Sequence, residues 1–172
     1  MERKHKKSTL RVATGGVLLA LSIATLFSAT FIPGVELTLF TFSSFYVAFI
    51  IIESDLKGGI LFYVASLLLG AILIPNKGAL LPYAMFFGLY GIVKLLIEKI
   101  KKIPIELILK LVFFNISYAI GLLFFKELFL GNIDLPNLAL PVLLVGAQVF
   151  FLFYDYLFTL VIGFYLSSRP KS

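Results

Sequence analysis

The stretch that decides the fold is residues 138–164, which read LALPVLLVGAQVFFLFYDYLFTLVIGF. A helix that crosses the hydrocarbon core of a bilayer needs about 20 mostly apolar residues, and this stretch exceeds that length. Its one acidic side chain, Asp155, is costly at such a depth, so it faces a protein-lined cavity, shares a hydrogen bond or carries a proton. The stretch therefore predicts a membrane-spanning helix whose polar side chain is turned away from lipid.

The composition of the whole chain points the same way. Hydrophobic residues make up 60% of the 172 positions and the mean hydropathy is +1.06, whereas a soluble domain is about 45–50% apolar. Cysteine is absent and His5 is the only histidine, which excludes disulfides, Cys/His zinc sites and Ser–His–Asp hydrolysis within the chain. No P-loop motif is present. We expect no metal, no cofactor and no enzymatic activity.

Six apolar runs are long enough, or nearly long enough, to cross a bilayer. They cover residues 10–32, 36–52, 56–74, 79–97, 105–125 and 139–166. The sequence thus predicts an all-α integral membrane protein, a six-helix bundle over residues 10–166, between a basic cytoplasmic N-terminus (1–9) and a cytoplasmic tail (167–172). Ser54 or Asp55 is the expected N-cap of the third helix. Because the second and third runs are short, a tilted or partly re-entrant hairpin stays open there.

The basic residues predict the orientation. In a six-span arrangement only Lys77 and Lys126 fall on the outer side, and all the others fall on the inner side: Arg3, Lys4, Lys6, Lys7, Arg11, Lys57, Lys94, Lys99, Lys101, Lys102, Lys110, Arg169 and Lys171. Because cytoplasmic loops carry the excess of Lys and Arg, we expect a multi-pass protein of the cell membrane with both termini in the cytoplasm. The net charge of +6 lies in short clusters between apolar runs. That pattern indicates that the charges orient the helices in the bilayer, and it does not favour nucleic-acid binding.

The first helix carries small residues along one face. Gly16, Ala20, Ala24 and Ser28 follow one another at four-residue intervals, and Ala13 lies one turn before them. Small side chains at this spacing let a second helix approach closely, which is a main source of helix association in lipid. The neighbour is either another helix of the same chain or a different subunit, and the spacing alone leaves both open.

Five polar residues are candidates for contacts with a small-molecule ligand. Asn76 and Lys77 lie in a Pro-Asn-Lys-Gly turn, Asn115 lies in the fifth helix, and Gln148 and Asp155 lie seven residues apart on one face of the last helix. Further polar groups are expected on the outer side: Glu36, Lys126, Glu127, Asn132 and Asp134. The simpler interpretations are a solvated turn for the first two residues and a helix-to-helix hydrogen bond for Asn115.

At the level of architecture the chain resembles the substrate-binding S component of an energy-coupling factor (ECF) transporter. The resemblance is carried by about six spans in fewer than 200 residues, the basic N-terminus, the short second and third helices, and the small face Ala13, Gly16, Ala20 and Ala24. The chain departs from the usual pattern in having Gly16 where an alanine is expected. It also resembles uncharacterised Firmicutes membrane proteins with runs like residues 74–77 (IPNK) and 86–94 (FFGLYGIVK).

The resemblance implies capture of a vitamin or related micronutrient on the external side, with energy supplied by an ATPase pair through a T subunit. It implies that Ala13, Gly16, Ala20 and Ala24 dock onto that subunit. Two other classes stay open: a non-transporting scaffold or assembly protein, and a stand-alone proton-coupled carrier that uses Asp155. An intramembrane enzyme is disfavoured because no second acid or histidine accompanies Asp155 at catalytic spacing.

Overall fold

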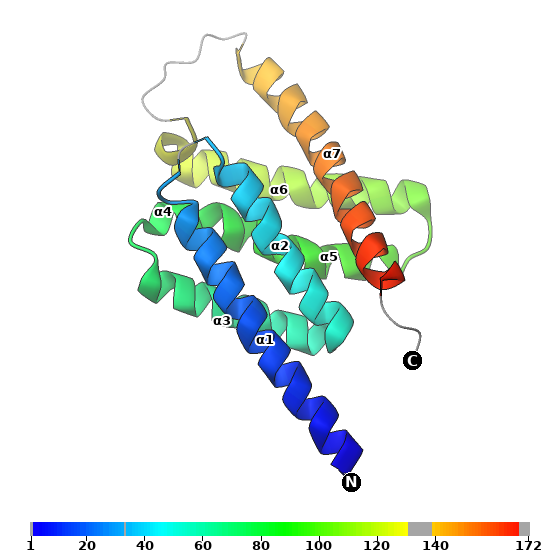
Figure 1. Cartoon of the computed structure of the whole chain (residues 1–172). Coiled ribbons are helices and arrows are strands. Elements are labelled where there is room, and N and C mark those ends of the chain that lie inside the picture. The colour runs from blue at the N-terminus through cyan, green and yellow to red at the C-terminus, as the bar shows by residue number, and fades with distance from the viewer. Residues whose placement is uncertain (1, 33, 131–138, 169–172) are drawn as a thin grey trace. The chain divides into compact units, whose positions relative to one another are not determined.

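The computed structural model describes residues 2–32, 34–130 and 139–168, and every regular element in that part of the chain is helical. In chain order the elements are α1 (Glu2–Ser28), α2 (Glu36–Glu53), α3 (Leu56–Leu73), α4 (Lys77–Pro82), the π-helical turn η1 (Tyr83–Phe87), α5 (Gly88–Glu98), α6 (Ile103–Leu130) and α7 (Ala139–Ser167) (Figure 1). Six helical stretches are long and apolar enough to cross a membrane. The chain is therefore an all-helical protein of the multi-pass membrane type.

Some predicted features fall outside the described part. Asn132 and Asp134 of the expected outer loop lie there, as do the side chains of Lys126 and Glu127. The same holds for the side chains of residues 2–8 in the basic N-terminal segment and for residues 169–172 of the tail.

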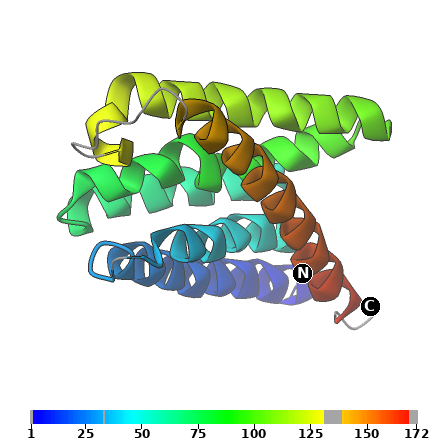
Figure 2. The ribbon, with the colours of Figure 1, turned by 90° about the horizontal axis from the view of Figure 1, so that it is seen from above.

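The described chain divides into two compact units, residues 1–96 and 97–172. In the first unit α1 packs against both α2 and α3, and α2 also packs against α3. Figures 1 and 2 both show α1 and α2 side by side. Leu26 and Val47 are almost fully buried, with exposed fractions of 1% and 0%. The apolar core of this unit includes these residues of α1 and α2 and also Tyr83 of η1 and Tyr90 of α5, both fully buried.

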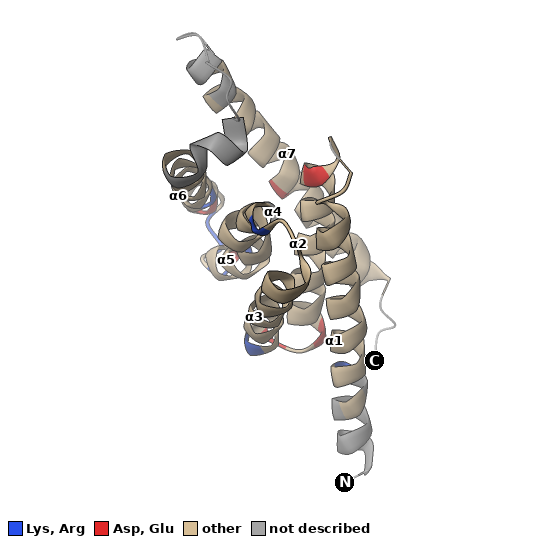
Figure 3. Ribbon diagram, turned by 90° about the vertical axis from the view of Figure 1, so that its left-hand side faces the viewer, with Lys and Arg blue, Asp and Glu red and all other residues tan. Residues whose placement is uncertain are grey.

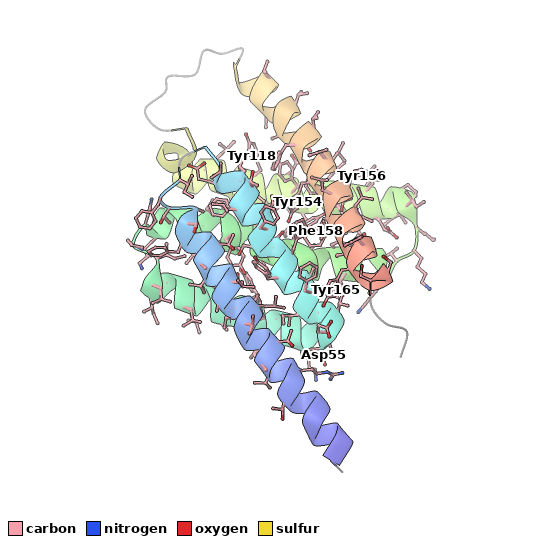
Figure 4. The ribbon with its side chains drawn as sticks, viewed as in Figure 1. Asp55, Tyr118, Tyr154, Tyr156, Phe158 and Tyr165 are labelled. Carbon is pink, nitrogen blue, oxygen red and sulfur yellow. The ribbon has the colours of Figure 1, made fainter. Side chains whose placement is uncertain are left out.

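The turn between α2 and α3 confirms the expected N-cap. The Asp55 carboxylate accepts a hydrogen bond from the Gly58 amide at 2.7 Å, and Figure 4 labels this side chain. Figure 3 shows the charged residues of α2 and α3 only at or near the helix ends. Each helix has 18 residues, about 27 Å at 1.5 Å per residue. That is close to the thickness of a hydrocarbon core, about 30 Å.

The first helix differs from its predicted bounds at both ends. It begins at Glu2 instead of residue 10, because Lys, Arg and Glu are good helix formers and the helix continues through the charged segment. It ends at Ser28, and the residues up to Ile32 form turns. The following residue in the sequence is Pro33, which disfavours helical conformation in the residue before it.

The fourth predicted span, residues 79–97, corresponds to the candidate span Leu80–Glu98, which contains a π-helical turn. The helix begins at Lys77 and is interrupted by η1 before it continues as α5. Pro82 lies directly before η1 and has no amide hydrogen, so the regular ladder of hydrogen bonds loses a donor there. The Gly88 amide donates to the carbonyl of Tyr83, five residues before it, which is the bonding pattern of a π-turn.

Candidate functional site

In the second unit, Asp155 of α7 is paired with a lysine of α6. The Lys110 ammonium lies 3.2 Å from the Asp155 carboxylate and 2.8 Å from the Glu98 carboxylate at the end of α5. The Lys110 side chain is 7% exposed, that of Asp155 18%, and that of Glu98 40%. Of the three surroundings expected for Asp155, the structure therefore shows a shared hydrogen bond, made with a cation.

Lys110 is the functional candidate that the sequence analysis missed. It was counted only as one of the inner-side cations, yet its side chain is buried inside the protein. The signal was available, because Lys110 lies within the apolar run 105–125. A cation at such a position carries the same desolvation cost as an acid and has the same need of a partner.

A second polar pair joins the same two helices. The Gln148 amide donates to the Asn115 side-chain oxygen at 2.8 Å, and the Asn115 amide lies 3.5 Å from the Gln148 oxygen. The Asn115 amide also donates to the Leu111 carbonyl at 2.8 Å. These contacts match the simpler interpretation of Asn115 as a residue that holds helices together, a role that polar side chains often have in lipid.

An aromatic contact accompanies the two polar pairs. The Phe114 and Phe151 rings stack with their centroids 4.6 Å apart and their planes 13° apart. We call this set of residues the α6–α7 seam: Lys110, Phe114 and Asn115 on α6, and Gln148, Phe151 and Asp155 on α7. Gln148 and Asp155 both make their contacts with α6, as their seven-residue spacing predicts.

The aromatic residues around Asp155 have different surroundings. Tyr154 and Phe158 are buried, with exposed fractions of 1% and 0%, whereas Tyr156 is 61% exposed; all three are labelled in Figure 4. On α6, the Tyr118 ring stacks on Phe114 at 5.8 Å. The Tyr118 hydroxyl is buried and has no hydrogen-bond partner among the described residues. Phe114 of the seam thus stacks on both Phe151 and Tyr118, and the Tyr118 hydroxyl is a buried polar group beside it.

Asn76 and Lys77 belong to the first unit, where their side chains complete helix ends. The Lys77 ammonium donates to the Ala71 and Ile74 carbonyls at the end of α3. The Asn76 side chain accepts from the Gly78 amide at 3.1 Å and so caps α4. Both contacts satisfy backbone groups that a helix end leaves without partners. The five predicted ligand residues thus fall into two groups, of which only Asn115, Gln148 and Asp155 meet along one seam.

The small-residue face of α1 borders an open groove between α1 and α3. Gly16, Ala20 and Ala24 line it on one side, Leu69 and Leu73 on the other, and its volume is about 690 Å³. Ala13, Gly16, Ala20 and Ala24 are all exposed. A Cβ atom added to Gly16 would meet nothing within 4 Å. Within the first unit, α2 and α3 therefore leave this face of α1 accessible.

A buried group of hydroxyls in the first unit was not foreseen. The hydroxyls of Ser22 on α1 and Ser43 on α2 lie 2.9 Å apart, and those of Ser66 on α3 and Tyr83 on η1 lie 2.7 Å apart. All four side chains are fully buried. Isolated serines in apolar helices give little warning of this, because only the folded unit shows which hydroxyls meet.

Comparison with protein-family models, with curated proteins and with solved structures gives no match for this chain.

Proposed function

We propose that this chain is the substrate-capture membrane subunit of an ECF-type uptake transporter. In this proposal it is not an enzyme. It binds a vitamin or related micronutrient on the external side of the cell membrane, and an ATPase pair drives it through a T subunit. Both termini are cytoplasmic, as the distribution of lysine and arginine predicts.

The observation that carries the proposal is the exposed small-residue face of α1 beside its groove. Gly16, Ala20 and Ala24 allow the backbone of a second helix to come close, and Leu69 and Leu73 provide an apolar wall for its side chains. Van der Waals packing of this kind drives helix association where lipid removes the hydrophobic effect. A helix of the T subunit is the occupant that the proposal assigns to the groove.

The ligand contacts are assigned to the predicted polar residues. Asn115 is exposed although it bonds Gln148, and the proposal assigns it a contact with the ligand. Pockets for small molecules are mostly apolar with a few well-placed polar groups, and the aromatic and amide groups of the α6–α7 seam have that character. Asp155 is assigned to the same ligand region, and Asn76 and Lys77 to the external turn.

Co-purification tests the docking surface. The chain is expressed with candidate T and ATPase subunits, and the recovery of the complex is compared for wild type, Ala20→Leu and Val17→Leu. Ala20→Leu adds bulk inside the groove and is expected to lower recovery at least tenfold. Val17 is 61% exposed on the same helix and does not line the groove, so Val17→Leu is the matched control. Equal recovery of all three proteins contradicts the proposal.

Mass spectrometry of small molecules retained after gentle purification tests the capture role. A retained compound that raises the melting temperature when it is added back supports ligand binding, because a ligand that binds only the folded state stabilises it. Uptake into liposomes by the chain alone would indicate instead a stand-alone proton-coupled carrier that uses Asp155.

One observation favours a second candidate, a non-transporting membrane scaffold or assembly protein. Asn115 bonds Gln148, Asp155 pairs with Lys110, and Lys77 caps α3, so these polar groups already have structural partners. A scaffold would show no ligand-dependent thermal shift. A scaffold would still bind a partner protein through its surface, so partner binding alone does not separate the two candidates.

A further inference from the structure

Three lysines lie in the short connection between α5 and α6. This α5–α6 turn, residues 99–102, reads KIKK and joins the candidate spans Leu80–Glu98 and Ile103–Leu123. Lys99, Lys101 and Lys102 are exposed, and among the described residues their ammonium groups have no ion pair or hydrogen bond. The sequences of the other connections between helices contain no lysine or arginine. Positive charge is thus concentrated at this one turn.

Exposed apolar side chains alternate with these lysines. Ile100 lies between the first two lysines and is 41% exposed, and Ile103 follows the third and is 81% exposed. A segment that rests at the boundary of a bilayer has this mixture, because its apolar side chains enter the acyl region while its cations reach the headgroups. The turn therefore has the side chains of an interfacial segment.

The length of the turn limits how far it can rise from the bilayer. Its four residues extend over at most about 14 Å, and a connection that leaves the bilayer and returns rises by about half of that length. The polar layer on each side of the hydrocarbon core is about 5–8 Å thick. With the two spans in the bilayer, the three ammonium groups thus lie at the depth of lipid headgroups.

The backbone holds Lys101 in a conformation that favours glycine. Its φ is 56°, in the left-handed region where the Cβ of other residues crowds the following carbonyl oxygen. Helices often end with glycine in this conformation. The Ile100 amide donates to the Ile97 carbonyl at 3.0 Å and so closes the end of α5. Glycine would allow the same turn with less strain, so the turn geometry does not account for a lysine here.

We propose that the α5–α6 turn binds the headgroups of anionic phospholipids. Lysine ammonium groups bind phosphate through charge-assisted hydrogen bonds, and basic segments beside a membrane span attract anionic lipids. A lipid surface fits better than a soluble acidic protein, because the turn stays at headgroup depth and its isoleucines face the same layer. This inference goes beyond the proposed function and needs neither a captured ligand nor a T subunit.

Native mass spectrometry of the full chain tests the proposal. The protein is released from nanodiscs that contain equal amounts of phosphatidylcholine and phosphatidylglycerol, and the retained lipids are counted. Both leaflets have the same composition, so the result does not depend on the orientation of the chain. Wild type is expected to retain phosphatidylglycerol over phosphatidylcholine by about fivefold.

Variants of the three lysines identify the binding group. The triple variant Lys99→Gln, Lys101→Gln and Lys102→Gln is expected to lose the preference for phosphatidylglycerol. The corresponding triple replacement by arginine is expected to keep it, because the guanidinium group also binds phosphate. A preference in the triple glutamine variant equal to that of wild type overturns the proposal.

Lys57 provides the matched control. It is exposed on α3 beside Asp55, in a turn of mixed charge. Lys57→Gln and Lys102→Gln each remove one positive charge, but only Lys102→Gln is expected to lower the preference for phosphatidylglycerol. Equal effects would mean that the net charge of the chain sets the preference, and they would overturn the proposal. Displacement of the lipid by soluble glycerol phosphate at constant ionic strength would indicate a site for soluble phosphate and would also overturn it.

Lys101→Gly separates lipid binding from stability. In nanodiscs of phosphatidylcholine alone this variant is expected to melt at the same temperature as wild type or higher, because glycine adopts the left-handed conformation without strain. Its preference for phosphatidylglycerol is expected to fall. A lower melting temperature together with an unchanged lipid preference would show that Lys101 has a structural role and would overturn its assignment to the headgroup site.

Discussion

Asn115 and Gln148 each place an amide in an apolar helix, and each amide bonds to the other. The same holds for the charges, since Asp155 meets Lys110. At the scale of the residue, therefore, the polar groups of α6 and α7 lower one another's cost of desolvation. In lipid such interactions are usually modest, about 0.6 kcal/mol on average and up to about 1.7 kcal/mol.

The Asn115–Gln148 pair gives a prediction at this scale. In a double-mutant cycle with Asn115→Ala and Gln148→Ala, we expect a coupling energy of about 1 kcal/mol in the free energy of unfolding, because each single change already removes the shared hydrogen bonds. Unfolding in mixed micelles measures it. Asn115→Ala combined with Ser167→Ala, whose hydroxyl bonds the Phe164 carbonyl within its own helix, should show no coupling. A coupling of zero for Asn115 and Gln148 would mean that the bonds add no stability.

At the scale of the element, the interrupted fourth span is the feature with the clearest consequence. Because η1 follows Pro82, the Tyr83 hydroxyl reaches Ser66 and the Tyr63 hydroxyl donates to the Ala84 carbonyl at 2.6 Å. Gly88 follows η1 directly and leaves room for both tyrosine rings. A Cβ atom at this position would lie 2.7 Å from Tyr63 and 2.9 Å from Tyr83.

We therefore expect Gly88→Ala to destabilise the protein by about 1–3 kcal/mol, the usual cost of overpacking a core. Thermal or chemical unfolding of the purified chain measures the change. Gly146→Ala and Gly163→Ala in α7 are the matched controls, since an added Cβ meets nothing within 4 Å there. They should be neutral or slightly stabilising, because alanine is the better helix former. If Gly88→Ala behaves like these controls, the rings of Tyr63 and Tyr83 can move aside from the added Cβ atom without a loss of stability.

At the scale of the whole molecule, six helical stretches satisfy the length and hydropathy of membrane spans. Six crossings would place both termini on one side, and the excess of basic residues predicts that this side is the cytoplasm. Two of the cations used in that argument, Lys94 and Lys110, are buried in the protein. The orientation therefore depends on the remaining inner-side lysines and arginines, most of all on the N-terminal cluster and the α5–α6 turn.

Cysteine labelling in intact cells tests this orientation. The chain has no cysteine of its own, so single replacements report without background. We expect Val35→Cys, between α1 and α2, to react with a membrane-impermeant maleimide from outside. Lys102→Cys and Ser168→Cys should react only after the membrane is permeabilised. Labelling of Lys102→Cys in intact cells would contradict the predicted orientation.

The sequence by itself determined the helical class and the approximate position of each span, because apolar runs of this length depend only on local composition. It also limited the cap of α3 to Ser54 or Asp55, of which the structure shows Asp55. The shared face of Gln148 and Asp155 and the small-residue face of α1 follow from helical spacing. The assignment of ligand and docking roles to these residues stays a prediction.

Only the tertiary structure decided which polar groups meet. Lys110 and Asp155 are 45 residues apart in the sequence, and no periodicity within either helix reveals that one lies opposite the other. The same holds for the contact between Ser66 on α3 and Tyr83 on η1. Spacing along a helix fixes the direction of a side chain, whereas its partner depends on how separate helices pack.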